Sequence, residues 1–170
     1  STFVTSRWRY LRMPILEATK RAVYDAFLCY HVLCFRDQQL DQDREVAFTE
    51  QFGTLERHIA SNRGAVNPLV HIVSNLGPDG KPSGKVASTS WHSDKSFRPQ
   101  PSLATILHAL VMPPDGGETC FANMIAAYEA LPEAEKAELH SVRVVHSWEI
   151  SQARAGTPAP PQEIARAPAM

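Results

Sequence analysis

The apolar residues of this chain occur in short runs that are closed by proline, glycine or polar turn formers. No run approaches the roughly 20 residues that a helix needs to cross a bilayer. Short runs rich in β-branched and aromatic residues predict strands, and the chain contains them at His31–Phe35, Leu69–Val73 and Val142–His146. Leu103–Val111 is a longer apolar run bounded by prolines.

Helices are predicted between these runs. The spacing of apolar residues over Ile15–Leu28 is typical of an amphipathic helix. A second helix is expected from Asp41, a plausible N-cap, to the terminator Gly53, and a third from Met124 to Leu131. The second helix is defined by its apolar positions Val46, Ala47, Phe48 and Phe52. Several strands with a few flanking helices favour the α+β class.

Composition indicates one folded domain with a small-molecule partner. With 170 residues and 44% hydrophobic content, residues 1–150 can form a single domain with a core. Residues 151–170 are rich in proline and alanine and predict a mobile loop or linker. The formal charge of −1, without a cluster of basic and aromatic residues, gives no sign of a nucleic-acid partner.

The cysteines and the N-terminus indicate in which cellular compartment the protein is expected. Three cysteines form an odd, unpatterned set, which argues against a disulfide framework and suits a reducing environment. Residues 1–10 do not resemble a secretory signal. We therefore expect a cytoplasmic protein without a membrane segment.

The run Trp91–Asp94 carries the strongest chemical signal. On an extended strand, His92 and Asp94 project from the same side, so both could hold one metal ion. A His-x-Asp triplet alone is weak, because an ordinary hydrogen bond between the two side chains is the commoner arrangement. Its neighbours strengthen the metal interpretation, since hydroxyls precede it at residues 88–90 and an aromatic wall follows at Phe97.

A second candidate feature is the turn Gly116–Thr119. Its two glycines permit a close approach of the backbone, and the Thr119 hydroxyl that follows could bind an anionic ligand. A loop rich in turn formers at Asn75–Pro82 could form the rim of a pocket.

Five motifs in order resemble the taurine/alkylsulfonate and aryloxyalkanoate (TauD/TfdA) branch of the iron(II)- and 2-oxoglutarate-dependent dioxygenases. They are Phe35–Gln38, Phe52–His58, Ser74–Asn75, Trp91–Asp94 and Pro113–Met124. The resemblance implies a distorted double-stranded β-helix, or jelly roll, with flanking helices. It also implies an enzyme whose cofactors are Fe(II), the co-substrate 2-oxoglutarate and O2.

The resemblance assigns roles to individual residues. His92 and Asp94 match two of the three protein ligands to iron and are the predicted catalytic and metal residues. Thr119 matches the position whose hydroxyl holds a carboxylate of 2-oxoglutarate, and His58 matches a position that contacts the substrate anion. Weaker substrate-pocket candidates, placed by nearness to the motifs, are Asn75 and Ser88.

Two His and one carboxylate leave three metal positions open for a bidentate 2-oxo acid and O2. The implied reaction hydroxylates a small anionic organic substrate and releases succinate and CO2. Sulfonates, sulfate esters, aryloxyacids and carboxylates are all handled within this branch. Family members often form dimers or tetramers, so a homo-oligomer is possible here.

The chain also departs from the family pattern. The distal His ligand and the arginine that pairs with the far carboxylate of 2-oxoglutarate cannot be identified, and His140 and His146 are weak substitutes. We therefore expect the functional protein to be longer than this chain. The chain alone would lack the distal part of the jelly roll. One alternative is a catalytically silent, metal-free jelly-roll binding module, and another is a hydrolase that uses His92 and Asp94 on a different metal. The retained glycine turn speaks against both.

Overall fold

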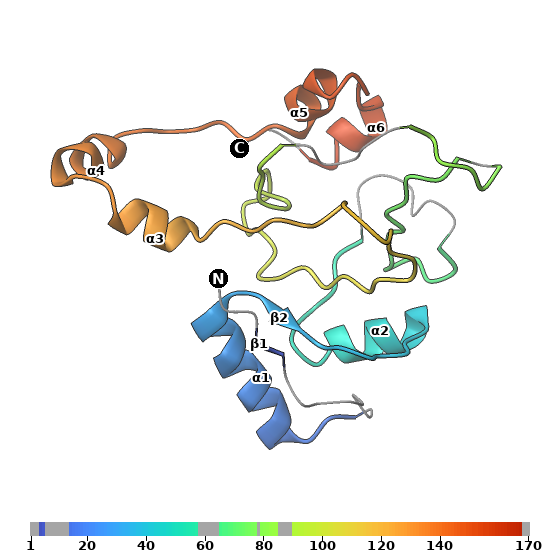
Figure 1. Ribbon diagram of the computed structural model, residues 1–170. Helices are drawn as coiled ribbons and strands as arrows, with labels where there is room; N and C mark the ends of the chain where they lie inside the picture. Colours follow the sequence, from blue (N-terminus) through green and yellow to red (C-terminus); the bar gives the residue numbers. More distant parts are fainter. Residues whose placement is uncertain (1–3, 6–13, 58–64, 78, 85–89, 168–170) are drawn as a thin grey trace. The chain divides into compact units, whose positions relative to one another are not determined.

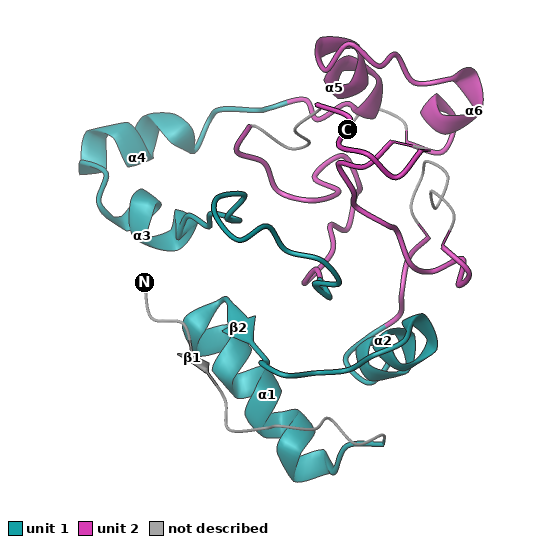
Figure 2. Ribbon diagram, turned by 45° about the vertical axis from the view of Figure 1, so that its right-hand side comes forward, with its two compact units in different colours: residues 1–53, 107–144 teal, residues 54–106, 145–170 magenta. Residues whose placement is uncertain are grey.

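The computed structural model describes residues 4–5, 14–57, 65–77, 79–84 and 90–167. These residues divide into two compact units, one of residues 1–53 and 107–144 and the other of residues 54–106 and 145–170 (Figure 2). Figure 1 labels the secondary structure, which is β1 Val4–Thr5, α1 Glu17–Tyr30, β2 Leu33–Cys34, α2 Gln42–Thr49, α3 Met124–Glu129, α4 Glu133–Leu139, α5 Trp148–Arg154 and α6 Pro161–Ile164.

The first unit begins with the predicted amphipathic helix, which is confirmed as α1. Val23 is buried on its inner face, whereas the Glu17–Lys20 and Arg21–Asp25 pairs lie on its solvent side. The helix ends at Tyr30, and the C-cap residue His31, with a φ of 64°, turns the backbone into the left-handed region. The chain then enters β2, which pairs in parallel with β1 through Leu33 and Cys34.

The second helix confirms the predicted cap. The Asp41 carboxylate accepts a hydrogen bond from the Arg44 backbone N–H at 2.8 Å, which satisfies one free donor of the first turn of α2. The predicted end is wrong, because α2 stops at Thr49 and Phe52 lies in the turn beyond it. Phe52 still packs on the buried Phe48, with ring centroids 5.2 Å apart.

The apolar centre of the first unit is small. Phe48 also meets Phe35 edge to face at a centroid distance of 6.0 Å, and Val23 and Val46 are buried as well. The Gln51 side-chain oxygen accepts a hydrogen bond from the Ile15 N–H at 3.1 Å, which ties the start of α1 to the end of α2.

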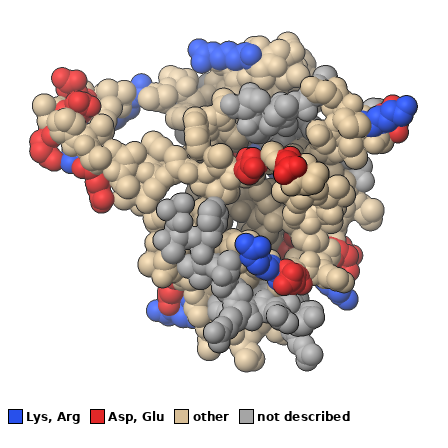
Figure 3. Space-filling model, in the orientation of Figure 1, with Lys and Arg blue, Asp and Glu red and all other residues tan. Residues whose placement is uncertain are grey.

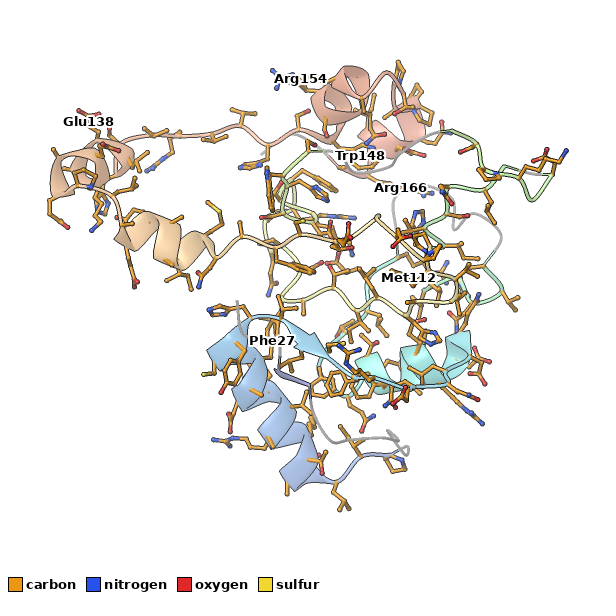
Figure 4. All side chains as sticks on the ribbon, in the orientation of Figure 1. Phe27, Met112, Glu138, Trp148, Arg154 and Arg166 are labelled. Atoms are coloured by element: carbon orange, nitrogen blue, oxygen red, sulfur yellow. The ribbon has the colours of Figure 1, made fainter. Side chains whose placement is uncertain are left out.

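Helices α3 and α4 occupy the later part of the first unit. Asn123 caps α3 by accepting from the Ala126 N–H at 3.0 Å, so the predicted start at Met124 is confirmed. The helix ends at Glu129, two residues before the expected Leu131. Acidic side chains gather over α4, as Figure 3 shows, and Glu138 lies on its outer side (Figure 4).

The second unit contains few regular elements among its described residues. The predicted loop at residues 75–82 is confirmed as a turn closed by the isolated bridge Leu76–Pro82. The segment predicted as a mobile loop or linker contains the end of α5 and all of α6, and Ser147 caps α5 through the Ile150 N–H at 3.3 Å. Figure 4 shows Trp148 at the start of α5, while Arg154 extends away from the helix.

The predicted strands at Leu69–Val73 and Val142–His146 are not formed, and Leu103–Val111 carries no strand either. A strand exists only when a second segment pairs with its backbone groups. In the part of the chain that the structure describes, the only two-stranded sheet is β1 with β2, so a jelly roll is not visible.

Many apolar side chains of these segments are exposed. Leu107, Leu110, Val111, Val144 and Val145 are each at least 66% accessible to solvent. The sequence contains the apolar runs, but among the described residues these runs lack the backbone pairing that would make them strands.

Candidate active site

The second unit brings His92 and Asp94 together. The Nε2 atom of His92 lies 3.4 Å from Oδ1 of Asp94, and the two side chains are 51% and 50% exposed. The extended strand expected for these two residues is not formed, because the segment has no regular secondary structure up to Ser93 and a turn begins at Asp94. The two groups thus face each other and remain accessible to solvent, as metal ligands at the mouth of a site must be.

A backbone carbonyl contacts the second ring nitrogen of His92. Its Nδ1 atom lies 2.9 Å from the carbonyl oxygen of Ser90. Because a carbonyl only accepts, Nδ1 carries a proton in this contact, which leaves Nε2 as the ring nitrogen that could bind a metal. Nε2 is also the atom that faces Oδ1 of Asp94.

The second oxygen of Asp94 is held separately. The Thr105 hydroxyl donates a hydrogen bond to Oδ2 at 2.7 Å. The two oxygens of this carboxylate therefore have different partners, Thr105 on one side and His92 on the other. The sequence interpretation missed Thr105, and its only signal was a hydroxyl inside an otherwise apolar run.

The donor set fits a divalent metal. Two ligands about 2.1 Å from one ion at a right angle lie roughly 3 Å apart, close to the His92–Asp94 separation. Imidazole with carboxylate is a donor combination that Fe(II) accepts. Among the described residues, no group of three or more His, Cys, Asp or Glu side chains gathers around a common point. The third protein ligand is therefore not identified in that part of the chain.

Three side-chain contacts fix the turn that follows Asp94. Lys95, at a φ of 53°, forms an ion pair with Glu56 at 3.0 Å. The Ser96 hydroxyl lies 3.0 Å from Nδ1 of His146, and the Phe97 ring lies 5.4 Å from the ring of Trp148. A turn held at three successive positions limits the movement of the carboxylate before it.

These contacts assign partners to two residues of the second unit. Lys95 directly follows the His92–Asp94 motif, and its side chain is only 22% exposed and is paired. His146, a weak candidate for the third ligand, instead supports the turn through Ser96. Neither contact could be inferred from the sequence, because each joins residues 39 or 50 positions apart.

Thr119 belongs to the first unit and is exposed. The turn before it confirms the role of glycine, since Gly116 and Gly117 have φ values of 75° and 76°. A Cβ atom at Gly117 would also lie 3.3 Å from the Pro113 ring. Among the described residues, no side chain between Asp115 and Phe121 makes a hydrogen bond or an ion pair.

The substrate candidates are less well placed. Asn75 is exposed at the start of the bridged loop, where its carbonyl accepts from the Ser83 N–H at 2.7 Å. His58 and Ser88 lie outside the described residues. Their substrate roles stay predictions.

A separate depression of about 430 Å³ lies in the first unit between residues 38–44 and 108–110. None of the predicted site residues lines it. Nearby, burial raises the pKa of Glu45, and the charge of His108 partly opposes this shift. The depression is thus distinct from the His92–Asp94 pair.

Comparison with known proteins identifies the class. The model of the taurine catabolism dioxygenase TauD, TfdA family matches residues 11–169, so this chain belongs to that family. The 2,4-dichlorophenoxyacetate dioxygenase of Burkholderia sp. (strain RASC), named as α-ketoglutarate-dependent, is 39% identical over 127 residues, which cover 68% of this chain and 43% of the relative.

Two further relatives widen the range of named activities. The (S)-phenoxypropionate/α-ketoglutarate dioxygenase of Delftia acidovorans is 33% identical over 145 residues, covering 82% of this chain and 50% of the relative. An alkylsulfatase of Acinetobacter baylyi is 31% identical over 142 residues, covering 82% and 42%. The chain thus spans about half the length of the curated relatives it matches.

No solved structure matches the chain significantly. Within the described residues, no helix has both the length and the apolar character that crossing a membrane requires. The family assignment therefore depends on sequence, and the site geometry on the structure.

Proposed function

We propose that this chain carries the metal-binding part of an Fe(II)- and 2-oxoglutarate-dependent dioxygenase. The observation that carries the proposal is the His92–Asp94 pair, in which Nε2 of the imidazole faces a carboxylate oxygen at 3.4 Å while Nδ1 contacts a backbone carbonyl. Family membership supports it independently, because relatives are named for dependence on α-ketoglutarate. In the whole protein, the fold is the jelly roll that the family resemblance implies.

In this proposal, His92 and Asp94 would hold the metal. Bound iron supplies the redox chemistry that activates O2 for hydroxylation of the substrate, with release of succinate and CO2. The protein residues orient the ligands. The Ser90 carbonyl keeps a proton on Nδ1 of His92. The Thr105 hydroxyl, together with the side-chain contacts of the turn at residues 95–97, keeps Asp94 in place.

The co-substrate and substrate positions follow from the same proposal. The Thr119 hydroxyl would donate to a carboxylate of 2-oxoglutarate, and the left-handed glycines before it present that hydroxyl on a sharp turn. His58, Asn75 and Ser88 would contact the substrate. A protonated His58 would favour an anionic group, which suits a carboxylate, sulfonate or sulfate ester.

We propose an aryloxyalkanoate as the first substrate class to examine. The relatives with 39% and 33% identity are named for 2,4-dichlorophenoxyacetate and (S)-phenoxypropionate. Both ligands combine a carboxylate with an aromatic ether. Alkyl sulfates form the second class, after the relative named alkylsulfatase.

The test is an anaerobic titration of the protein with Fe(II) and then 2-oxoglutarate, followed by visible absorption. A chelated 2-oxo acid on iron gives a charge-transfer band, and we expect this band in the wild type but not in Asp94→Ala. Succinate release is then measured with 2,4-dichlorophenoxyacetate, phenoxypropionate and an alkyl sulfate. Absence of the band in folded wild-type protein would contradict the proposal and favour a silent binding module.

A further inference from the structure

Among the described residues, Thr105 is the one hydroxyl that hydrogen-bonds the Asp94 carboxylate. It lies 11 residues after Asp94, and its Oγ1 atom donates to Oδ2 at 2.7 Å. Its neighbours Leu103, Ala104, Ile106 and Leu107 are all apolar. The hydroxyl therefore has a specific partner in a segment whose composition is otherwise that of a core strand.

The bond acts on a torsion that is otherwise loosely defined. The last torsion of an aspartate is broad, so an unrestrained carboxylate can present either oxygen, or both, to a ligand. A hydrogen bond from a neutral hydroxyl to an ionised oxygen is charge-assisted and short. The β-branched threonine has few accessible χ1 rotamers, so it holds its own hydroxyl in place.

We propose that Thr105 is a positioning residue for the metal site. By occupying Oδ2, it leaves Oδ1 facing His92 and makes Asp94 a ligand through one oxygen. This inference rests on the proposed function, because it assigns Thr105 a role in binding the same metal. It adds a residue that neither the family motifs nor the relatives' names assign.

The expected loss of Fe(II) affinity depends on how exposed the side chains of Asp94 and Thr105 are. Removing a partner of a metal-ligating side chain typically costs 10- to 100-fold in metal affinity. Asp94 is half exposed and Thr105 is exposed, so water can partly replace the hydroxyl. We therefore expect the lower end of that range, about tenfold.

The experiment measures Fe(II) affinity anaerobically by competition with a chromogenic chelator. Thr105→Val keeps the shape of the side chain and removes the donor, whereas Thr105→Ser keeps the donor. Thr157→Val is the matched control, because it removes another exposed side-chain hydrogen bond of the same unit, from Thr157 to Gln152 at 3.2 Å. The melting temperature of each metal-free variant is measured in parallel.

We expect Thr105→Val to weaken Fe(II) binding about tenfold, while Thr105→Ser and Thr157→Val stay within about threefold of the wild type. The metal-free melting temperatures should agree closely, since the bond is exposed. Thr105→Ala serves as a second donor-free variant if Val perturbs the fold, and it should show the same loss.

Three results overturn the inference. Wild-type Fe(II) affinity in both donor-free variants shows that Thr105 does not position the ligand, and the proposed function then survives. A lowered melting temperature with unchanged Fe(II) affinity assigns the bond a purely structural role. If the wild type itself binds no Fe(II), the proposed function and the inference fail together.

Discussion

The two candidate parts of the site, the His92–Asp94 pair and Thr119, differ in how many contacts restrain their side chains. In the second unit, His92 and Asp94 have hydrogen-bond partners at Ser90 and Thr105, and the turn after them is held by side-chain contacts at residues 95, 96 and 97. In the first unit, Thr119 follows two left-handed glycines and is exposed. The proposed metal ligands are thus oriented in advance, whereas the Thr119 hydroxyl, proposed to bind a carboxylate, has only its turn to orient it.

This difference matches what each group has to do. A metal ion requires its ligands within a few tenths of an ångström, so the supporting contacts must exist before the metal arrives. A single hydroxyl that donates to a carboxylate tolerates more freedom, because hydroxyl rotation can complete the bond on binding. We therefore expect substitutions in the His92–Asp94 region to act on metal affinity and those around Thr119 to act on 2-oxoglutarate affinity.

The largest effect is expected from Asp94→Ala. It removes a proposed ligand outright, so Fe(II) affinity should fall by more than about 100-fold, beyond the usual effect of a supporting residue. Because the side chain is 50% exposed, the melting temperature of the metal-free protein should change little. Glu129→Ala, which removes an exposed carboxylate at the end of α3, is the control and should leave Fe(II) affinity unchanged. Retained Fe(II) binding in Asp94→Ala would contradict the assignment of Asp94 as a metal ligand.

Thr119→Val tests the other side of the comparison. Loss of one hydrogen bond to a charged group corresponds to about 1.5–3 kcal/mol, or roughly 10- to 150-fold weaker 2-oxoglutarate binding. Fe(II) affinity should stay at the wild-type value, as measured by chelator competition. Thr119→Ser should restore 2-oxoglutarate binding to within a few fold. A parallel fall in Fe(II) affinity would show that the two regions are not separable in this way.

Gly117→Ala probes whether the turn itself orients Thr119. At a φ of 76° an alanine is strained by about 1–2 kcal/mol, and its Cβ would approach the Pro113 ring at 3.3 Å. We expect weaker 2-oxoglutarate binding by about tenfold with an unchanged Fe(II) affinity. Gly53→Ala is the matched control, because nothing lies within 4 Å of its added Cβ and its φ is not left-handed. Equal 2-oxoglutarate affinity in both variants would mean that the turn is free to relax.

The sequence predicted the local features of both regions and missed the long-range ones. The Asp41 cap, the left-handed glycines and the proximity of His92 to Asp94 follow from residues only a few positions apart. The contacts of Thr105 and His146 join distant segments that no local pattern relates. The same limit explains the predicted strands, since a strand needs a partner as well as a composition.

The smallest effect is expected from Lys95→Met, which removes the ion pair with Glu56 at 3.0 Å. Such pairs near the surface contribute roughly 0.2–1 kcal/mol, and the lysine is more covered than the glutamate, with 22% against 43% exposure. The free energy of unfolding should therefore fall by about 0.5 kcal/mol, and the difference should shrink as salt is raised. Urea titration at low and high salt measures this.

Lys81→Met, in the exposed loop after Gly80, is the control for loss of a positive charge and should be neutral. If the turn at residues 95–97 also helps to position Asp94, Lys95→Met should weaken Fe(II) binding, but by less than the tenfold expected for Thr105→Val. A larger loss than that of Thr105→Val would reverse the order of importance. The turn, rather than the hydroxyl on Oδ2, would then be the main restraint on the carboxylate.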